Sequence, residues 1–316
     1  MKDQATELRN LMLRAARTTR VDPGPPPRLL IASGGKGGVG VTTLSVRLAM
    51  ALAGQGTRVV LVDADPYRAD VATMCGLEER GSIADVLTSR CDIHEVLQPG
   101  PWGIQVAPGA WAPNKPTDFS EVAQQRLLRQ LRTLGRHTDM VLVDAGNSGS
   151  EVVRRFWQAA DDILLVTTAE PISVMDCYAA VKRMSRDGSE PAIRLLVNKV
   201  DNPRTGESVH RRIDTSCRRF LGASVGLLGH LPNCPILDHQ AKSDGAPLPQ
   251  MGDQALEQMA VALISEQHQD RSRGRLAKSR VEDENKHSIW AQLRTGLSPI
   301  EEGKASLCLS KSNCND

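Results

Sequence analysis

The chain is poor in aromatic residues, which make up only 3% of its 316 residues. So low a content argues against a surface on which the bases of single-stranded nucleic acid stack. No charge sign dominates either, because 39 Lys and Arg face 37 Asp and Glu, for a formal net charge of +2 at pH 7. Such a chain exerts no general attraction on nucleic acid or membranes. We therefore do not expect nucleic acid as a partner.

Long apolar runs and paired cysteines are missing as well. No stretch approaches the ~18 apolar residues of a membrane-spanning helix, and no signal-peptide pattern is visible. The seven cysteines are scattered, without a Cys-x-x-Cys pair, which is typical of reduced thiols in a cytosol. These absences predict a soluble, cytoplasmic protein, and any membrane contact is expected to be peripheral, at the inner face of the cell membrane.

The two ends of the chain differ in composition from its centre. Residues 1–18 have apolar side chains at helical spacing and predict an amphipathic helix, which the proline-rich linker at residues 19–27 separates from the rest. Residues 268–316 are polar and mixed in charge, which predicts disorder. Within this tail, residues 288–297 form either a short interfacial amphipathic helix or a solvated segment with chance spacing.

The central segment, residues 28–267, predicts an α/β fold. Its apolar runs are short and continuous, as in buried parallel strands, and helical patterns separate them. This alternation predicts a doubly wound, mostly parallel sheet with helices on both faces and ligands at the carboxyl ends of the strands. The expected strands cover residues 28–32, 58–62, 104–107, 139–143, 162–166, 193–197 and 224–228. The expected helices cover residues 42–53, 119–134, 150–160, 174–185, 206–221 and 253–266.

A glycine-rich loop, SGGKGGVGVTT at residues 33–43, lies between the first strand and the first helix. From Gly35 it follows the phosphate-binding pattern G-x-x-x-x-G-K-[ST], except that Val41 stands where the pattern has lysine. Glycines let backbone N–H groups curl around a phosphate, and the following helix adds its positive end. The predicted nucleotide-binding residues of this loop are Gly35, Gly37, Gly38, Val39, Gly40, Val41, Thr42 and Thr43.

Carboxylates follow two of the predicted strands. Asp63 and Asp65 end the run RVVLVDAD, and Asp144 ends DMVLVDAG. Both strand ends belong at the sheet edge that carries the glycine loop, where one carboxylate can hold Mg²⁺ and another can orient the attacking water. We predict Thr42, Asp63 and Asp144 as metal ligands and Asp63 and Asp65 as catalytic residues. Helix capping and turn formation are the alternative roles of such aspartates.

Two weaker signals concern the base of a nucleotide. Asn198 follows an apolar run, and an amide can pair with adenine through its donor and acceptor together. Pro232 comes after the last predicted strand and is expected on the other side of a base pocket. A simple turn at Asn198 is the alternative. The predicted cofactors are ATP or ADP together with Mg²⁺.

The glycine loop with its early lysine, Lys36, together with the VDAD and VDAG strand ends, resembles the deviant-Walker ATPases of the MinD and ParA group. Within this group the chain is similar to the FlhG family of flagellar number and placement regulators, also called FleN or YlxH. Three stretches carry this similarity: DQATELR at residues 3–9, AEPISVMDCYA at residues 169–179, and NKV at 198–200 with RFLG at 219–222 and LGHLP at 228–232.

The resemblance implies a MinD-like P-loop fold and a homodimer that forms face to face around two ATP molecules. Lys36 would act catalytically by reaching the partner's nucleotide. The amino-terminal element, with Asp3, Gln4, Leu8 and Arg9, would bind the GTPase FlhF and stimulate its hydrolysis. Flagellar switch and regulatory proteins are further expected partners, and a carboxy-terminal amphipathic helix would bind membrane in the ATP-bound dimer.

Val41 departs from the general P-loop pattern. Its lack of charge removes a contact to phosphate worth about 1.5–3 kcal/mol in binding, and more in the transition state. We therefore expect retained nucleotide binding with weak or absent hydrolysis. Three function classes stay open: a nucleotide-gated flagellar regulator with residual ATPase, a scaffold of the same family that does not hydrolyse ATP, and a ParA-type DNA partition ATPase. The last is favoured only by the tail and the arginines 211, 212, 218 and 219.

Overall fold

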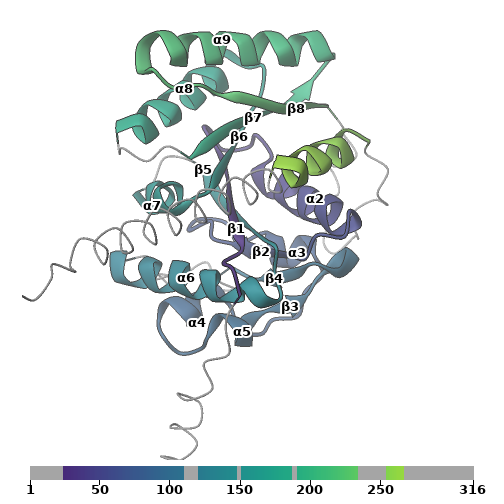
Figure 1. The fold of residues 1–316 in the computed structure, drawn as a ribbon, viewed down its shortest axis with the longest axis vertical. Coiled ribbons are helices and arrows are strands. Elements are labelled where there is room, and N and C mark those ends of the chain that lie inside the picture. Colours follow the sequence, from purple (N-terminus) through teal and green to yellow (C-terminus); the bar gives the residue numbers. More distant parts are fainter. Residues whose placement is uncertain (1–23, 110–119, 148–150, 187–190, 234–253, 267–316) are drawn as a thin grey trace, which may run out of the picture. The chain divides into compact units, whose positions relative to one another are not determined.

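The computed structural model describes residues 24–109, 120–147, 151–186, 191–233 and 254–266 (Figure 1). The amino-terminal element with Asp3, Gln4, Leu8 and Arg9 lies outside these residues, as do most of the linker, the tail from residue 267 and the helix predicted at 288–297. The chain divides into two compact units, Met1–Ser265 and Glu266–Asp316.

Eight strands form one sheet in the order β3-β4-β2-β5-β1-β6-β7-β8. Neighbouring strands are parallel throughout, except that β3 runs antiparallel to β4. The predicted doubly wound, mostly parallel α/β sheet is confirmed. The strands are β1 (Arg28–Gly34), β2 (Val59–Asp63), β3 (Gln98–Pro99), β4 (Gln105–Ala107), β5 (Met140–Asn147), β6 (Asp162–Thr167), β7 (Ala192–Val200) and β8 (Gly226–Pro232).

Helices cover both faces of this sheet (Figure 1). One apolar cluster joins the sheet to α4 through α9, and a second joins it to α2, α3 and an unlabelled helix at residues 254–266. The helices are α2 (Val41–Gly54), α3 (Val71–Met74), α4 (Ile83–Leu87), α5 (Ile93–Val96), α6 (Glu121–Thr133), α7 (Glu151–Ala159), α8 (Pro171–Arg186) and α9 (Pro203–Leu221), with 3₁₀ turns η1 (Pro101–Gly103) and η2 (Leu134–Arg136). None of the described helices combines the length and the apolar character needed to cross a bilayer.

Several boundaries differ from the prediction. Both α8 and α9 begin three residues earlier, each at a proline, because proline is favoured in the first turn of a helix. The last strand, β8, lies later than residues 224–228 and extends to Pro232. The short helices α3, α4 and α5 were not predicted, since four or five residues are too few to show a helical period.

The described end of the proline-rich linker packs against the domain. Pro27 is buried, and a Cβ added at Gly135 would collide with the carbonyl of Pro25. A proline has no N–H that burial could leave unpaired, so these residues can lie on the domain surface without losing a hydrogen bond. The described end of the linker is therefore part of the packed domain and not a free spacer.

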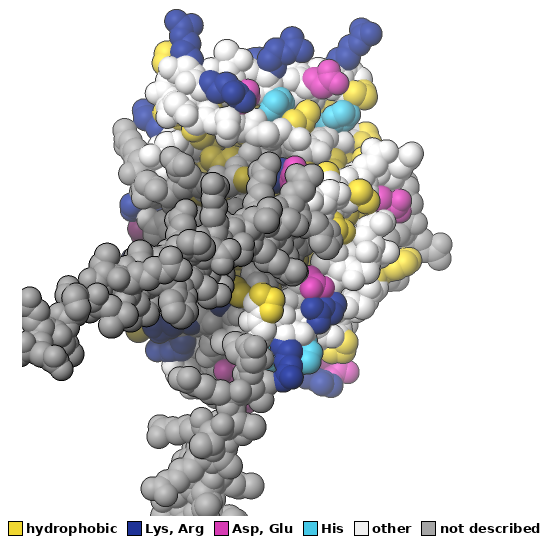
Figure 2. Space-filling model, in the orientation of Figure 1, with side chains coloured by type: hydrophobic (Ala, Val, Ile, Leu, Met, Phe, Trp, Pro, Cys, Tyr) yellow, Lys and Arg dark blue, Asp and Glu magenta, His cyan; other side chains and the backbone are white. Residues whose placement is uncertain are grey.

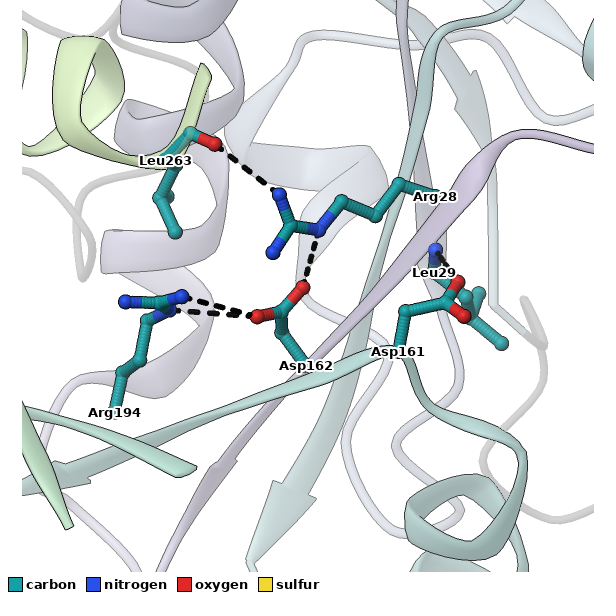
Figure 3. A network of polar contacts seen from close by, with 6 residues as sticks. All are labelled: Arg28, Leu29, Asp161, Asp162, Arg194 and Leu263. Carbon is teal, nitrogen blue, oxygen red and sulfur yellow. Dashed lines mark hydrogen bonds and ion pairs between the residues drawn. The ribbon is translucent and has the colours of Figure 1, made fainter. Parts of the chain in front are cut away.

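A buried ion network joins β1, β6 and β7 near the amino-terminal ends of these strands (Figure 3). The glycine loop follows the opposite, carboxyl end of β1. Asp162, at the start of β6, is 1% exposed and accepts a hydrogen bond from Arg28 of β1. Its other oxygen lies 3.3 Å from the Nη2 of Arg194 in β7. Arg28 also donates to the carbonyl of Leu263, at 3.3 Å, in the helix at residues 254–266. One carboxylate thus balances two guanidinium groups and joins β6 to β1 and β7, while Arg28 links β1 to the helix at residues 254–266.

Replacing Asp162 by alanine should destabilise the protein by about 3–5 kcal/mol, because two arginines would be left without their buried counter-charge. Urea unfolding of the variant and the native chain measures the difference. Glu151→Ala is the matched control, because Glu151 pairs with Arg154 on the surface and such pairs contribute about 0–1 kcal/mol. Equal losses of unfolding free energy in the two variants would contradict the prediction that the buried network stabilises the fold more than a surface ion pair does.

Candidate functional site

The glycine loop joins β1 to α2 and packs against α8. Gly40 directly precedes α2 and has a left-handed φ of 95°, and Gly38 has a φ of 83°. A Cβ at Gly35 would lie 2.6 Å from the backbone nitrogen of Cys177 in α8. These positions therefore require glycine. A loop of this form, followed by the positive end of a 14-residue helix, is suited to hold phosphate through backbone N–H groups.

Val41, the first residue of α2, is 8% exposed and belongs to the apolar cluster beneath the loop. Its side chain packs close to Gly34, where an added Cβ would lie 2.9 Å from the Val41 Cγ2. The following residues, Thr42 and Thr43, are half-buried. At the position where the general pattern has lysine, this chain therefore has an apolar side chain in apolar surroundings.

Asp63, the last residue of β2, lies opposite Asp144 of β5, and both are fully buried. β5 continues beyond Asp144 to Asn147. The Oδ2 of Asp63 accepts from the backbone N–H of Val71 at 3.1 Å. Asp144 accepts from the N–H of Gly146 at 3.1 Å and is hydrogen-bonded by the hydroxyl of Thr42. The Oδ2 of Asp144 is buried and has no hydrogen-bond partner. The structure thus brings together Thr42, Asp63 and Asp144, the three residues predicted as metal ligands.

Asp65 lies beside this pair and shapes the loop that follows β2. Its Oδ1 accepts from the backbone N–H groups of Tyr67 at 2.8 Å and Arg68 at 3.2 Å, as in a turn. A Cβ on Gly146, whose φ is 66°, would collide with the Asp65 carboxyl group. Gly146 therefore sets how closely Asp65 approaches the end of β5. It was not among the predicted site residues, although its place two residues after Asp144 was a usable signal.

Lys36 extends from the glycine loop toward the start of α8. Its Nζ lies 2.9 Å from an oxygen of Glu170, and the two side chains are 40% and 63% exposed. An exposed pair of this kind contributes about 0–1 kcal/mol, so a modest competing interaction can redirect the lysine. The sequence had not identified Glu170 as a partner of Lys36.

The predicted base-side residues lie at the same sheet edge. Asn198 is 9% exposed and donates from Nδ2 to the carbonyl of Val39 at 2.8 Å, while its Oδ1 accepts from the N–H of Lys199 at 2.9 Å. The amide therefore connects β7 to the glycine loop. Pro232 is the last residue of β8, opposite Val200, and does not follow the strand as predicted.

A protein-family model described as an AAA domain matches residues 28–187. The chain is 34% identical over 207 residues to the antiactivator FleN of Pseudomonas aeruginosa, which covers 66% of this chain and 74% of the relative. The chain belongs to the MinD/ParA group of P-loop proteins. Within this group it is also similar to the flagellum site-determining protein YlxH of Helicobacter pylori, at 26% identity over 75% of this chain and 80% of the relative.

Solved structures of MinD proteins share the fold of this MinD/ParA-type chain. The cell division ATPase MinD of Pyrococcus furiosus superposes with a TM-score of 0.62 at 21% identity, over 75% of this chain and 98% of that one. MinD of Pyrococcus horikoshii, solved with Mg-ADP, gives a TM-score of 0.61 at 21% identity, over 75% of this chain and 96% of that one. At this identity the likeness establishes the fold.

Burial governs the protonation of the acidic residues in this MinD/ParA-type site. Removal from water raises the pKa of Asp144 to about 6. It raises the pKa of Asp63 well above its usual value, and the adjacent Asp144 charge adds to this. Burial also raises the pKa of Asp65. Two neighbouring buried carboxylates, one with an unpartnered oxygen, form an environment that a divalent cation would stabilise.

Mg²⁺ fits the donors present. The described residues contain no group of three or more His, Cys, Asp or Glu that could enclose a metal alone. Mg²⁺ commonly binds through one or two carboxylates and completes its shell with water and substrate phosphate. Asp144 and Asp63, with the Thr42 hydroxyl, would hold such an ion next to the glycine loop.

Without a divalent cation, stability should fall by about 2–3 kcal/mol as pH rises from about 4 to about 6. The folded state holds the Asp144 proton more tightly than the unfolded state does, so deprotonation disfavours folding in this window, and the contribution of Asp144 levels off above its folded-state pKa of about 6. The raised pKa values of Asp63 and Asp65 act in the same direction. Asp144→Asn should remove the contribution of Asp144 to this pH dependence and any stabilisation by Mg²⁺ with nucleotide, as measured by thermal unfolding. Glu78→Gln, at an exposed ion pair, is the control, and an unchanged profile in Asp144→Asn would contradict the assignment.

Proposed function

We propose that this chain is a nucleotide-gated regulator of flagellar number and placement. The glycine loop beside the buried pair Asp63 and Asp144 carries the nucleotide part of the proposal. The similarity to FleN and YlxH supports the flagellar part. The expected ligands are ATP or ADP with Mg²⁺, for which the Mg-ADP complex of the MinD from P. horikoshii provides the precedent.

The proposed nucleotide-bound form is a homodimer in which Lys36 of each copy contacts the nucleotide of the other. The geometry of Lys36 supports this, because the residue is partly exposed and its bond to Glu170 is a surface ion pair. A phosphate group offers more negative charge than one carboxylate, and the dimer interface would shield the contact from water. Dimerisation would then replace the Lys36–Glu170 pair by a bond to phosphate. We also propose that the tail, which lies outside the described residues, contacts the membrane in this form.

Hydrolysis should be very slow in the native chain, because Val41 brings no charge to the transferred phosphate. Val41→Lys should raise the turnover of Mg·ATP at least tenfold, since a cation at this position acts mainly on the transition state. The measurement is steady-state phosphate release by the full chain.

Val41→Met is the matched control for this experiment. It tests the effect of a longer side chain at a position that is 8% exposed, without adding charge. Thermal unfolding of both variants separates loss of fold from loss of activity. A folded Val41→Lys variant that is no faster than the native chain would show that Val41 is not what limits hydrolysis.

The amino-terminal element is the proposed activator of the GTPase FlhF. The full chain and a peptide of residues 1–20 should both accelerate GTP hydrolysis by that enzyme. Gln4→Ala should abolish the acceleration, because an amide at this position can orient the attacking water. Glu7→Gln, in the same element, is the control. A peptide without effect, together with activity in a chain that lacks residues 1–20, would refute this role.

A ParA-type DNA partition function is the second candidate. It is favoured by α9, where Arg211, Arg212 and Arg219 are exposed and Arg218 pairs with Asp214. Lys and Arg side chains project along this edge of the molecule (Figure 2). Non-specific DNA binding would weaken steeply with salt and with loss of these arginines. Stimulation of the GTPase without DNA binding would favour the flagellar regulator instead.

A further inference from the structure

The end of β7 forms a four-residue segment, Asn198-Lys199-Val200-Asp201, at the sheet edge that carries the glycine loop. Nucleotides bind outside the carboxyl ends of the strands in sheets of this kind. The Asn198–Val39 hydrogen bond of 2.8 Å fixes the segment directly against the loop. Gly40 leaves room for this contact, since a Cβ there would lie 2.7 Å from the Asn198 Nδ2. The base of a nucleotide whose phosphates occupy the loop therefore has this segment as a neighbour.

Asn198 is already committed to this contact. Its Nδ2 bonds to the loop and its Oδ1 bonds to the N–H of Lys199. Lys199 has a left-handed φ of 57°, uncommon for a residue other than glycine and frequent at functional sites. This left-handed residue lies in β7, two positions before Asp201. Asn198 acts as a positioning residue, so another side chain must distinguish one base from another.

Asp201 is exposed and makes no hydrogen bond or ion pair with any other described residue. The structural role expected of an aspartate at this place is to cap α9, but Asn202 fills it by accepting from the N–H of Thr205 at 3.0 Å. Pro232, opposite Val200 at the end of β8, lies at the same edge and offers an apolar ring. The segment thus combines a fixed amide, a residue in the left-handed region and a carboxylate that makes no hydrogen bond or ion pair with the described residues.

A carboxylate accepts hydrogen bonds and donates none. Guanine offers two adjacent donors on its pairing edge, N1–H and N2–H₂, which one carboxylate can accept together. Adenine presents its N1 acceptor there, which a carboxylate repels. From this chemistry we propose that Asp201 makes the base subsite a guanine-recognition site, so that the chain binds GTP at least as tightly as ATP. This inference rests on the proposed nucleotide site and concerns only the base.

The test is calorimetric titration of the full chain with GTP, ATP and XTP in the presence of Mg²⁺. The native chain should bind GTP at least as tightly as ATP. Asp201→Asn should weaken GTP binding by roughly tenfold to a hundredfold and leave ATP binding no weaker. The same variant should bind XTP more tightly than the native chain does, because an amide can donate to the O2 of xanthine and accept from its N1–H.

Glu207→Gln is the control, because it removes an exposed carboxylate of α9 near the site. ATP binding tighter than GTP binding in the native chain overturns the proposal, and so does a loss of GTP affinity in Asp201→Asn no larger than in the control. If ATP binds and GTP does not, the proposed function stands and the guanine subsite fails. If no nucleotide binds, both fail.

Discussion

The site depends on two carboxylates that the parallel sheet buries side by side. Asp63 and Asp144 lie opposite each other because β2 and β5 are paired in parallel, in a register that runs from Val59 opposite Met140 to Asp63 opposite Asp144. Their mutual repulsion and their removal from water both favour the neutral acid or a bound cation. Two acids buried side by side disfavour each other's charged form unless a cation neutralises them. Their burial therefore supports the proposed Mg²⁺ site.

The glycine loop is held from two sides as well as by its own strand. Asn198 of β7 bonds to it on one side, and on the other it packs so closely against α8 that Gly35 leaves no space for a Cβ. Trp157 of α7 donates to the hydroxyl of Ser33 at 3.2 Å where β1 enters the loop. A ligand that shifts the loop would therefore also shift α8, whose first two turns carry an exposed Ile172 and Met175.

Much of this arrangement could be predicted from local patterns. The run Val59–Val62 followed by Asp63 indicated both a buried strand and the place where its carboxylate would emerge, and the glycines before Val41 indicated the loop. The starts of α8 and α9 were placed three residues too late, because the apolar spacing did not mark the first turns, which begin at Pro171 and Pro203. The packing of Pro25 against Gly135 had no local signal, since it joins segments far apart in the sequence.

The sequence by itself determined the alternation of strands and helices, the loop and the acidic strand ends, because each depends on neighbouring residues. The tertiary structure alone decided which side chains meet. It joined Asn198 to the loop carbonyl of Val39, placed Lys36 beside Glu170, and left Asp201 without a hydrogen bond or ion pair to any other described residue. Strand order and register set these contacts, and both follow from packing over the whole sheet, which no local pattern records.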